Sequence, residues 1–89
     1  MKVIKEIKPS GKMARLAQEI RDSKYLLIMS GDSNKVSYMD IYDLKDYSKV
    51  LCLKQEKLCF ISELKNGNFV LTYDKAKMII ASIDLEKKY

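Results

Sequence analysis

The sequence predicts an all-β protein built from two copies of one antiparallel sheet unit. The first observation is a repeat, because the stretch that begins at Glu19 matches, by residue type, the stretch that begins at Glu63, 44 residues later. The second is a succession of short apolar runs separated by turn residues, which is typical of strands. The third is Asn66-Gly67 between two such runs, since both residues tolerate the positive φ of tight hairpin turns.

The chain is short enough to be a single domain. It has 89 residues, of which 47% are hydrophobic and 33% charged, as in a folded globular protein. A chain of this length buries only about 60–65% of the surface that its unfolded form exposes, so we expect marginal stability. We divide the domain, residues 1–89, into an outer strand at residues 1–8, a first repeat at residues 13–54 and an incomplete second repeat at residues 57–85.

The first repeat contains three clear strand patterns. Residues 24–30 hold an apolar run bounded by turn residues on both sides, which predicts a buried strand. Residues 36–44 are rich in Val, Tyr and Ile, and residues 48–54 form a further apolar run. Ahead of them, residues 1–8 form the expected outer strand, which ends at Pro9 because proline cannot donate to a strand ladder.

Residues 12–22 can be interpreted in two ways. Their apolar residues recur at i, i+3, i+4 and i+7, which is the spacing of an amphipathic helix. The repeat favours a strand, because Leu16 and Gln18 fall on Phe60 and Ser62 with the same alternation of apolar and polar side chains. We therefore expect a strand here. The alternative is a small α+β domain in which a helix at residues 12–22 packs on an antiparallel sheet.

The second repeat supplies the equivalents of the first three strands. They are expected at residues 57–64, 68–74 and 77–85. An equivalent of residues 48–54 is lacking after them, so the second unit has one strand fewer than the first. Residues 1–8 would supply such a strand at the other end of the chain.

The order and spacing of these segments resemble the WD40 repeat family over nearly the whole chain. Tyr42-Asp43 stands at the place of the family's Trp-Asp pair, and Ile83-Asp84 stands there in the second copy. Asp32 and Asp74 match the family's aspartate in the turn between its second and third strands. The resemblance implies two four-stranded antiparallel blades of a β-propeller.

The chain departs from the family pattern at two places. Residues 54–57 replace the family's Gly-His pair, and the sequence contains no Trp. Ser30 and Thr72 approximate the hydroxyl of the family's second strand. The family's buried Asp-His-Ser-Trp hydrogen-bond network therefore cannot form as such, and each blade loses the stabilisation that these hydrogen bonds would give.

The residue inventory argues against an enzyme. There is no His, which removes the usual general base and the usual metal ligand. Cys52 and Cys59 are seven residues apart, which is not a zinc-binding spacing, and their apolar neighbours suggest two reduced, buried thiols. We expect neither catalytic activity nor a cofactor or metal ion.

The expected function is a non-enzymatic protein–protein interaction or scaffold module. Two blades cannot close a propeller, which uses about four to eight. Copies of the chain could therefore associate, the chain could dock onto a larger propeller, or the strands could fold into one compact domain. The candidate partner-contact loops contain Lys12, Asp32, Asn34, Lys35, Gln55, Glu56, Asp74 and Lys75.

A small basic nucleic-acid-binding α+β domain is the alternative function. The net charge of +5 and the six tyrosines would suit a single strand of nucleic acid. The basic residues are spread along the chain and not gathered in a run, which favours a protein partner. The sequence shows neither a secretory signal nor an apolar run of about 18 residues, so we expect a cytoplasmic protein without a membrane partner.

Overall fold

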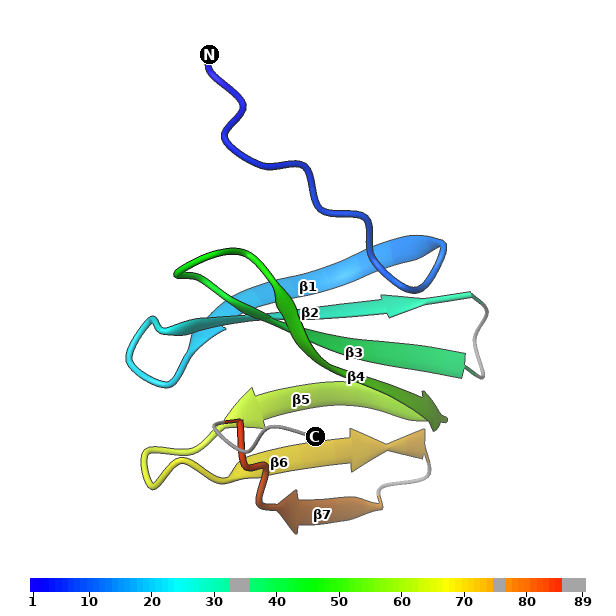
Figure 1. Ribbon diagram of the computed structural model, residues 1–89. Helices are drawn as coiled ribbons and strands as arrows, with labels where there is room; N and C mark the ends of the chain where they lie inside the picture. Colours follow the sequence, from blue (N-terminus) through cyan, green and yellow to red (C-terminus); the bar gives the residue numbers. More distant parts are fainter. Residues whose placement is uncertain (33–35, 75–76, 86–89) are drawn as a thin grey trace.

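The computed structural model describes residues 1–32, 36–74 and 77–85, which form seven strands in two antiparallel sheets (Figure 1). The first sheet has the order β1 (Met13–Ile20), β2 (Tyr25–Gly31), β3 (Val36–Asp43) and β4 (Lys49–Glu56). The second sheet has the order β5 (Leu58–Glu63), β6 (Phe69–Tyr73) and β7 (Met78–Ala81). The described residues contain no helix, and hence none that could cross a membrane. The prediction of an all-β chain is confirmed.

The strand expected in place of the helix at residues 12–22 is present as β1. It pairs with β2 from Met13 opposite Gly31 to Ile20 opposite Tyr25. The alternative α+β fold is therefore wrong. The reason is tertiary: β2 is buried on both faces and needs a hydrogen-bonded neighbour on this edge, which outweighs the weak helix preference of β1.

The two sheets carry the same irregularity at equivalent places. β1 bulges at Arg15, between Ala14 and Leu16, and β5 bulges at Cys59, 44 residues later. A bulge re-aims the strand and increases its twist. The common bulge supports the equivalence of the two units that the sequence repeat predicts.

The pairing corrects the alignment of β2 with β6 by one residue. The sequence repeat places Leu27 on Leu71. In the structure Leu27 pairs with Gln18, whereas Ser62, the equivalent of Gln18, pairs with Val70. The structural counterpart of Leu27 is therefore Val70. The second hairpin has the shorter turn: the Leu64 N–H already donates to the Asn68 carbonyl, whereas the first turn spans residues 21–24. A shift of one residue exchanges the two faces of a strand.

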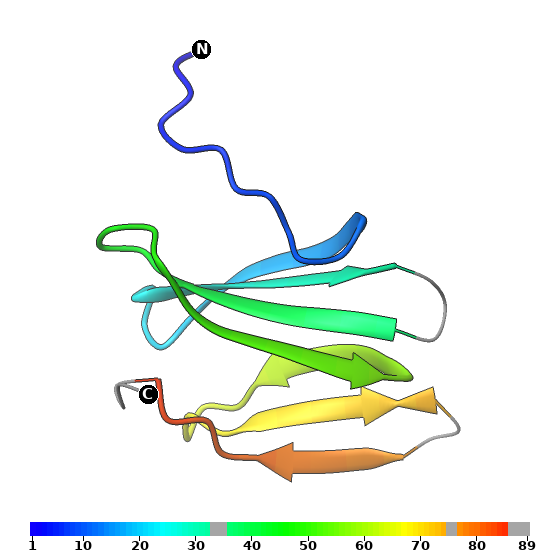
Figure 2. The same ribbon diagram turned by 45° about the vertical axis from the view of Figure 1, so that its right-hand side comes forward.

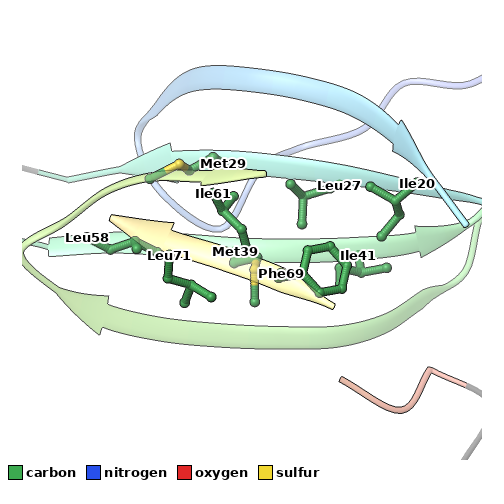
Figure 3. Packing of buried hydrophobic residues seen from close by; sticks show 9 residues of the cluster. All are labelled: Ile20, Leu27, Met29, Met39, Ile41, Leu58, Ile61, Phe69 and Leu71. Carbon is green, nitrogen blue, oxygen red and sulfur yellow. The ribbon is translucent and has the colours of Figure 1, made fainter. Parts of the chain in front are cut away.

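The core lies between the two sheets (Figure 3). Alternate residues of β2, Leu27 and Met29, pair with Ile41 and Met39 of β3, and all four are buried. The complete buried cluster is Ile20, Leu27, Met29, Met39, Ile41, Leu58, Ile61, Phe69 and Leu71. Each of these side chains contributes about 1.5–3 kcal/mol through burial, so the contact between the sheets is the main source of stability.

Residues 1–9 leave the first sheet as an extended arm (Figures 1 and 2). None of them lies in a strand of the structure, although residues 1–8 are expected to be an outer strand. Met1, Val3 and Ile4 are exposed, with Ile4 at 78%. The arm therefore does not complete a sheet of its own chain, and its pairing with another blade stays a prediction.

Both cysteines are free, as expected, but they are exposed and not buried. Cys52 lies in β4 between the half-buried Leu51 and Leu53, which pack against the core. Successive side chains of a strand point to opposite faces, so Cys52 points away from the core. Cys59 occupies the bulge of β5.

Candidate interaction surfaces

One face of the second sheet is apolar and exposed. In β6, Phe69 and Leu71 point into the core, so Val70 and Thr72 point to the opposite side. Their partners on β5 and β7 share that side. We call this surface the open face, and it consists of Phe60, Ser62, Val70, Thr72, Met78 and Ile80. Phe60, Met78 and Ile80 are 50%, 63% and 70% exposed, which is unusual for neighbouring apolar side chains on a soluble monomer.

The open face repeats the face of the first sheet that is buried beneath the second. Leu27 pairs with Gln18 and Ile41 as Val70 pairs with Ser62 and Ile80. In the same way, Met29 stands between Leu16 and Met39 as Thr72 stands between Phe60 and Met78. The second sheet therefore exposes a surface equivalent to the one with which the first sheet packs against the second.

The opposite side of the first sheet, which we call the outer face, is more varied. It consists of Ala14, Ala17, Glu19, Leu26, Ile28, Ser30, Tyr38, Asp40 and Tyr42. Ile28 and Tyr42 are buried, and Asp40 is buried completely. Its counterparts on the second sheet face the core, for example Phe69 for Leu26 and Leu71 for Ile28.

Asp40 anchors the arm to the outer face. The Ser10 backbone N–H donates to Asp40 Oδ2 at 2.9 Å, and the Ser10 hydroxyl donates to Oδ1 at 2.7 Å. Lys49 Nζ lies 3.8 Å from Oδ1 and supplies the positive charge. A buried carboxylate needs such partners because it has lost its contact with water. The sequence did not identify Asp40 as an anchor, because Ser10 lies 30 residues away.

The next two residues continue this attachment. The Gly11 N–H donates to Ser30 Oγ at 2.9 Å, and the Lys12 N–H donates to Asp32 Oδ1 at 3.0 Å. A Cβ on Gly11 would lie 2.6 Å from the Gly31 nitrogen, so this approach requires glycine. The structure thus brings together two of the predicted loop residues, Lys12 and Asp32.

Asp32 also orders the hydroxyl of Tyr38. The phenol donates to Asp32 Oδ2 at 3.0 Å, and this hydrogen bond raises the pKa of Tyr38 above its ordinary value. Both residues lie at the rim of the first sheet and are accessible to a partner.

A second group of predicted loop residues gathers where the two sheets meet. Gln55, Glu56 and Asp74 line one surface hollow together with Lys57 and Tyr73. The Tyr73 hydroxyl donates to Gln55 Oε1 at 3.2 Å, and the Asp74 N–H donates to the Lys57 carbonyl at 2.9 Å. The predicted residues Asn34, Lys35 and Lys75 lie outside the described residues.

Arg21 in the β1–β2 turn joins the two sheets at their opposite end. Its backbone N–H donates to Glu63 Oε1 at 3.0 Å and to Oε2 at 3.2 Å. Its Nη2 donates to the Ile83 carbonyl at 2.7 Å, and its guanidinium lies 5.5 Å from the centre of the Phe69 ring. Its Nε is 3.3 Å from Glu63 Oε2, which is an ion pair without the alignment of a hydrogen bond.

No local sequence pattern identifies Arg21 as a contact between the two sheets. The signal that could have identified its role is the repeat itself, in which Glu19 and Arg21 fall on Glu63 and Lys65. A pair of opposite charges recurring in register suggests a contact between successive units. Nothing local to the turn indicates that Glu63 is the partner.

Known proteins give no direct help with these surfaces. A comparison of the chain with protein-family models, curated proteins and solved structures found no significant match. Within residues 1–32, 36–74 and 77–85, His, Cys, Asp and Glu side chains do not gather in threes as a metal site requires. What the described surfaces offer chemically is apolar contact area, hydrogen bonds and charge pairs.

Proposed function

We propose that this protein is a non-enzymatic protein–protein interaction module, with two propeller-like blades, that works within a larger propeller or oligomer. One observation carries the proposal: the open face repeats the face by which the first sheet binds the second. A surface of this pattern already holds a β-sheet within the chain. Its exposed copy therefore suits a partner that also presents a sheet face.

The energetic argument is the same for both faces. Side chains such as Ile80 and Met78 gain about 1.5–3 kcal/mol each when a partner removes them from water. A stacked repeat unit buries its apolar faces only against its neighbours. Among the described residues, no neighbour covers the open face of the second sheet.

The chemistry of the open face favours protein over nucleic acid. Its six positions carry apolar side chains and hydroxyls but no Lys or Arg. Nucleic-acid binding depends on cations that neutralise phosphates. The excess of positive charge therefore lies elsewhere on the molecule.

Site-specific photo-crosslinking tests the proposal. A benzoylphenylalanine residue would replace Ile80 on the open face, and a control would carry it at Lys45 in the exposed β3–β4 turn. We expect protein adducts from position 80, either to the same chain or to another, and few from position 45. If position 80 gives no protein adduct in a chain whose circular dichroism shows strands, the proposed function is wrong.

A further inference from the structure

We infer that the partner of the open face is a second copy of this chain, bound head to tail through the outer face of its first sheet. This inference rests on the proposed function and specifies its partner. The two sheets of the chain are related by a rotation and a translation that place the second sheet against the first. The same movement, applied to the second sheet, places the first sheet of a next copy against the open face.

The apolar residues of the two faces suit this contact. Within the chain, Phe69 and Leu71 of the second sheet pack against the first sheet. Their counterparts on the outer face are Leu26, which is half-buried, and Ile28, which is only 7% exposed, and both are apolar. A neighbouring copy therefore presents Leu26 to the open face, at the position that Phe69 occupies against the first sheet.

The charges of the two faces are also complementary. Arg21 of the first unit forms an ion pair with Glu63 of the second, with Nε 3.3 Å from Oε2. The repeat places Lys65 at the position of Arg21 and Glu19 at the position of Glu63. Both Lys65 and Glu19 are exposed. Between copies, Lys65 of one chain faces Glu19 of the next, so the contact that joins the sheets is repeated.

The arm provides the third contact. Ahead of β1, the Gly11 N–H donates to Ser30 Oγ; ahead of β5, Gln55 Oε1 accepts from the hydroxyl of Tyr73, the counterpart of Ser30. The bonds differ in kind, but they join equivalent positions of the two units. The offset of 44 residues places residues 5–12 at the position of β4 (Lys49–Glu56), so residues 5–8 of the arm correspond to the first half of that strand.

This correspondence gives the arm a binding site. β4 pairs with β3 inside the first sheet, whereas β7, the counterpart of β3, lies at the edge of the second sheet. The edge offers backbone groups for a further strand. The arm of one copy therefore pairs with β7 (Met78–Ala81) of the preceding copy and completes a four-stranded sheet. In this register Ile7 falls on Leu51 and lies beside Ile80.

Repetition of this contact closes a ring. Each copy contributes two sheets, and propellers hold about four to eight, so two, three or four copies would close. In a closed ring no open face remains uncovered.

Charge exchange at Lys65 and Glu19 tests whether the partner is a second copy. Light scattering during size-exclusion chromatography would compare the unaltered chain, Lys65→Glu, Glu19→Lys and the double variant, with Lys45→Glu as the matched charge reversal. We expect a closed oligomer of 10.3 kDa chains. Each single variant should weaken association at least about tenfold because like charges then face each other. The double variant should restore it.

Two outcomes would overturn the inference and leave the proposed function standing. One is a monomeric unaltered chain whose position 80 still crosslinks to other proteins. The other is a double variant that associates no better than the single ones. A position 80 that crosslinks to nothing would overturn both.

Deletion of residues 1–8 tests the arm separately. The shortened chain keeps Ser10 and its bonds to Asp40, so the first sheet should fold, as circular dichroism would verify. We expect association to weaken at least about tenfold, and we expect β7 amides to exchange with solvent faster than in the unaltered chain. Unchanged mass and unchanged β7 exchange would show that the arm does not pair with β7.

Discussion

The backbone N–H of Arg21 donates to both carboxylate oxygens of Glu63, across the boundary between the two sheets, at 3.0 and 3.2 Å. Arg21 has a φ of 53°, and the following two residues of the turn also have positive φ. Left-handed geometry costs roughly 1–2 kcal/mol per non-glycine residue. The bonds to Glu63 offset part of this cost and fix how the sheets stack.

We expect Glu63→Gln to lower the free energy of unfolding by about 1–2 kcal/mol, because a neutral amide oxygen replaces the charged acceptor of the Arg21 N–H and the guanidinium loses its counter-charge. Urea denaturation at a fixed protein concentration measures this. Glu56→Gln, at an exposed position, is the matched control and should change stability by less than about 0.5 kcal/mol. Equal effects at the two positions would contradict the role of Glu63.

Gln18 lies on the buried face of the first sheet, and its Nε2 has no hydrogen-bond partner among the described residues. Gln18→Leu should therefore raise the free energy of unfolding by about 1–3 kcal/mol, since an unsatisfied buried amide is removed. The control is Gln55→Leu, which loses the bond to Tyr73 and should not stabilise the protein. A loss of stability in Gln18→Leu would show that the amide is satisfied in solution.

Ser10 supplies two of the partners of the buried Asp40 carboxylate. Ser10→Ala removes the hydroxyl bond of 2.7 Å, and we expect a loss of about 1.5–3 kcal/mol because the acceptor is charged. Thermal unfolding at matched concentration is the measurement. Ser82→Ala, at an exposed serine, should leave the midpoint unchanged. If both variants unfold at the same temperature, the hydrogen bond from the Ser10 hydroxyl to Asp40 does not contribute to stability.

The pKa of Asp46 lies below its ordinary value of 3.8, first because the Ser48 hydroxyl donates to its carboxylate and second because the Ser48 N–H does. The ionised form therefore stabilises the folded state at neutral pH. This contribution is fully present above pH 3.8 and is lost as the pH falls through the lowered value. In an NMR titration, Ser48→Ala should raise the pKa of Asp46, and Ser82→Ala should not.

We expect no measurable affinity for single-stranded nucleic acid at physiological salt, because the open face lacks basic side chains. Fluorescence anisotropy of a labelled oligonucleotide across a salt series is the measurement. Binding that falls steeply with salt and is lost on Phe60→Ala would favour the nucleic-acid alternative. A basic protein that binds an oligonucleotide only at low salt, and equally after Phe60→Ala, would fit unspecific attraction.

The sequence predicts the strands well wherever the two units share a pattern. The bulges at Arg15 and Cys59 lie in β1 and β5, which the repeat identifies as equivalent. The turn at Asn66-Gly67 is present, with Gly67 at a φ of 89°. These features depend on the local conformational preferences of the residues and on the similarity of the two repeats, and both can be recognised in a single sequence.

Features that depend on strand faces or on distant partners could not be predicted in the same way. A hairpin turn one residue shorter moves the counterpart of Leu27 from Leu71 to Val70, and residue types alone do not register this shift. The two thiols were expected to be buried because their neighbours are apolar, although Leu51 and Leu53 already fill the inward positions around Cys52. The anchor of Ser10 on Asp40 spans 30 residues, beyond the reach of any motif.

The edge position of β7 has a consequence for handling the protein. Met78-Ile79-Ile80-Ala81 is a short, uncharged, β-prone stretch, and all but the last of its side chains are exposed. Such stretches nucleate amyloid-like fibrils when nothing shields them, and a flanking charge slows this. Lys77, directly before the stretch, is the gatekeeper. Removal of its charge by acetylation should shorten the lag time of thioflavin-positive fibril growth in concentrated samples.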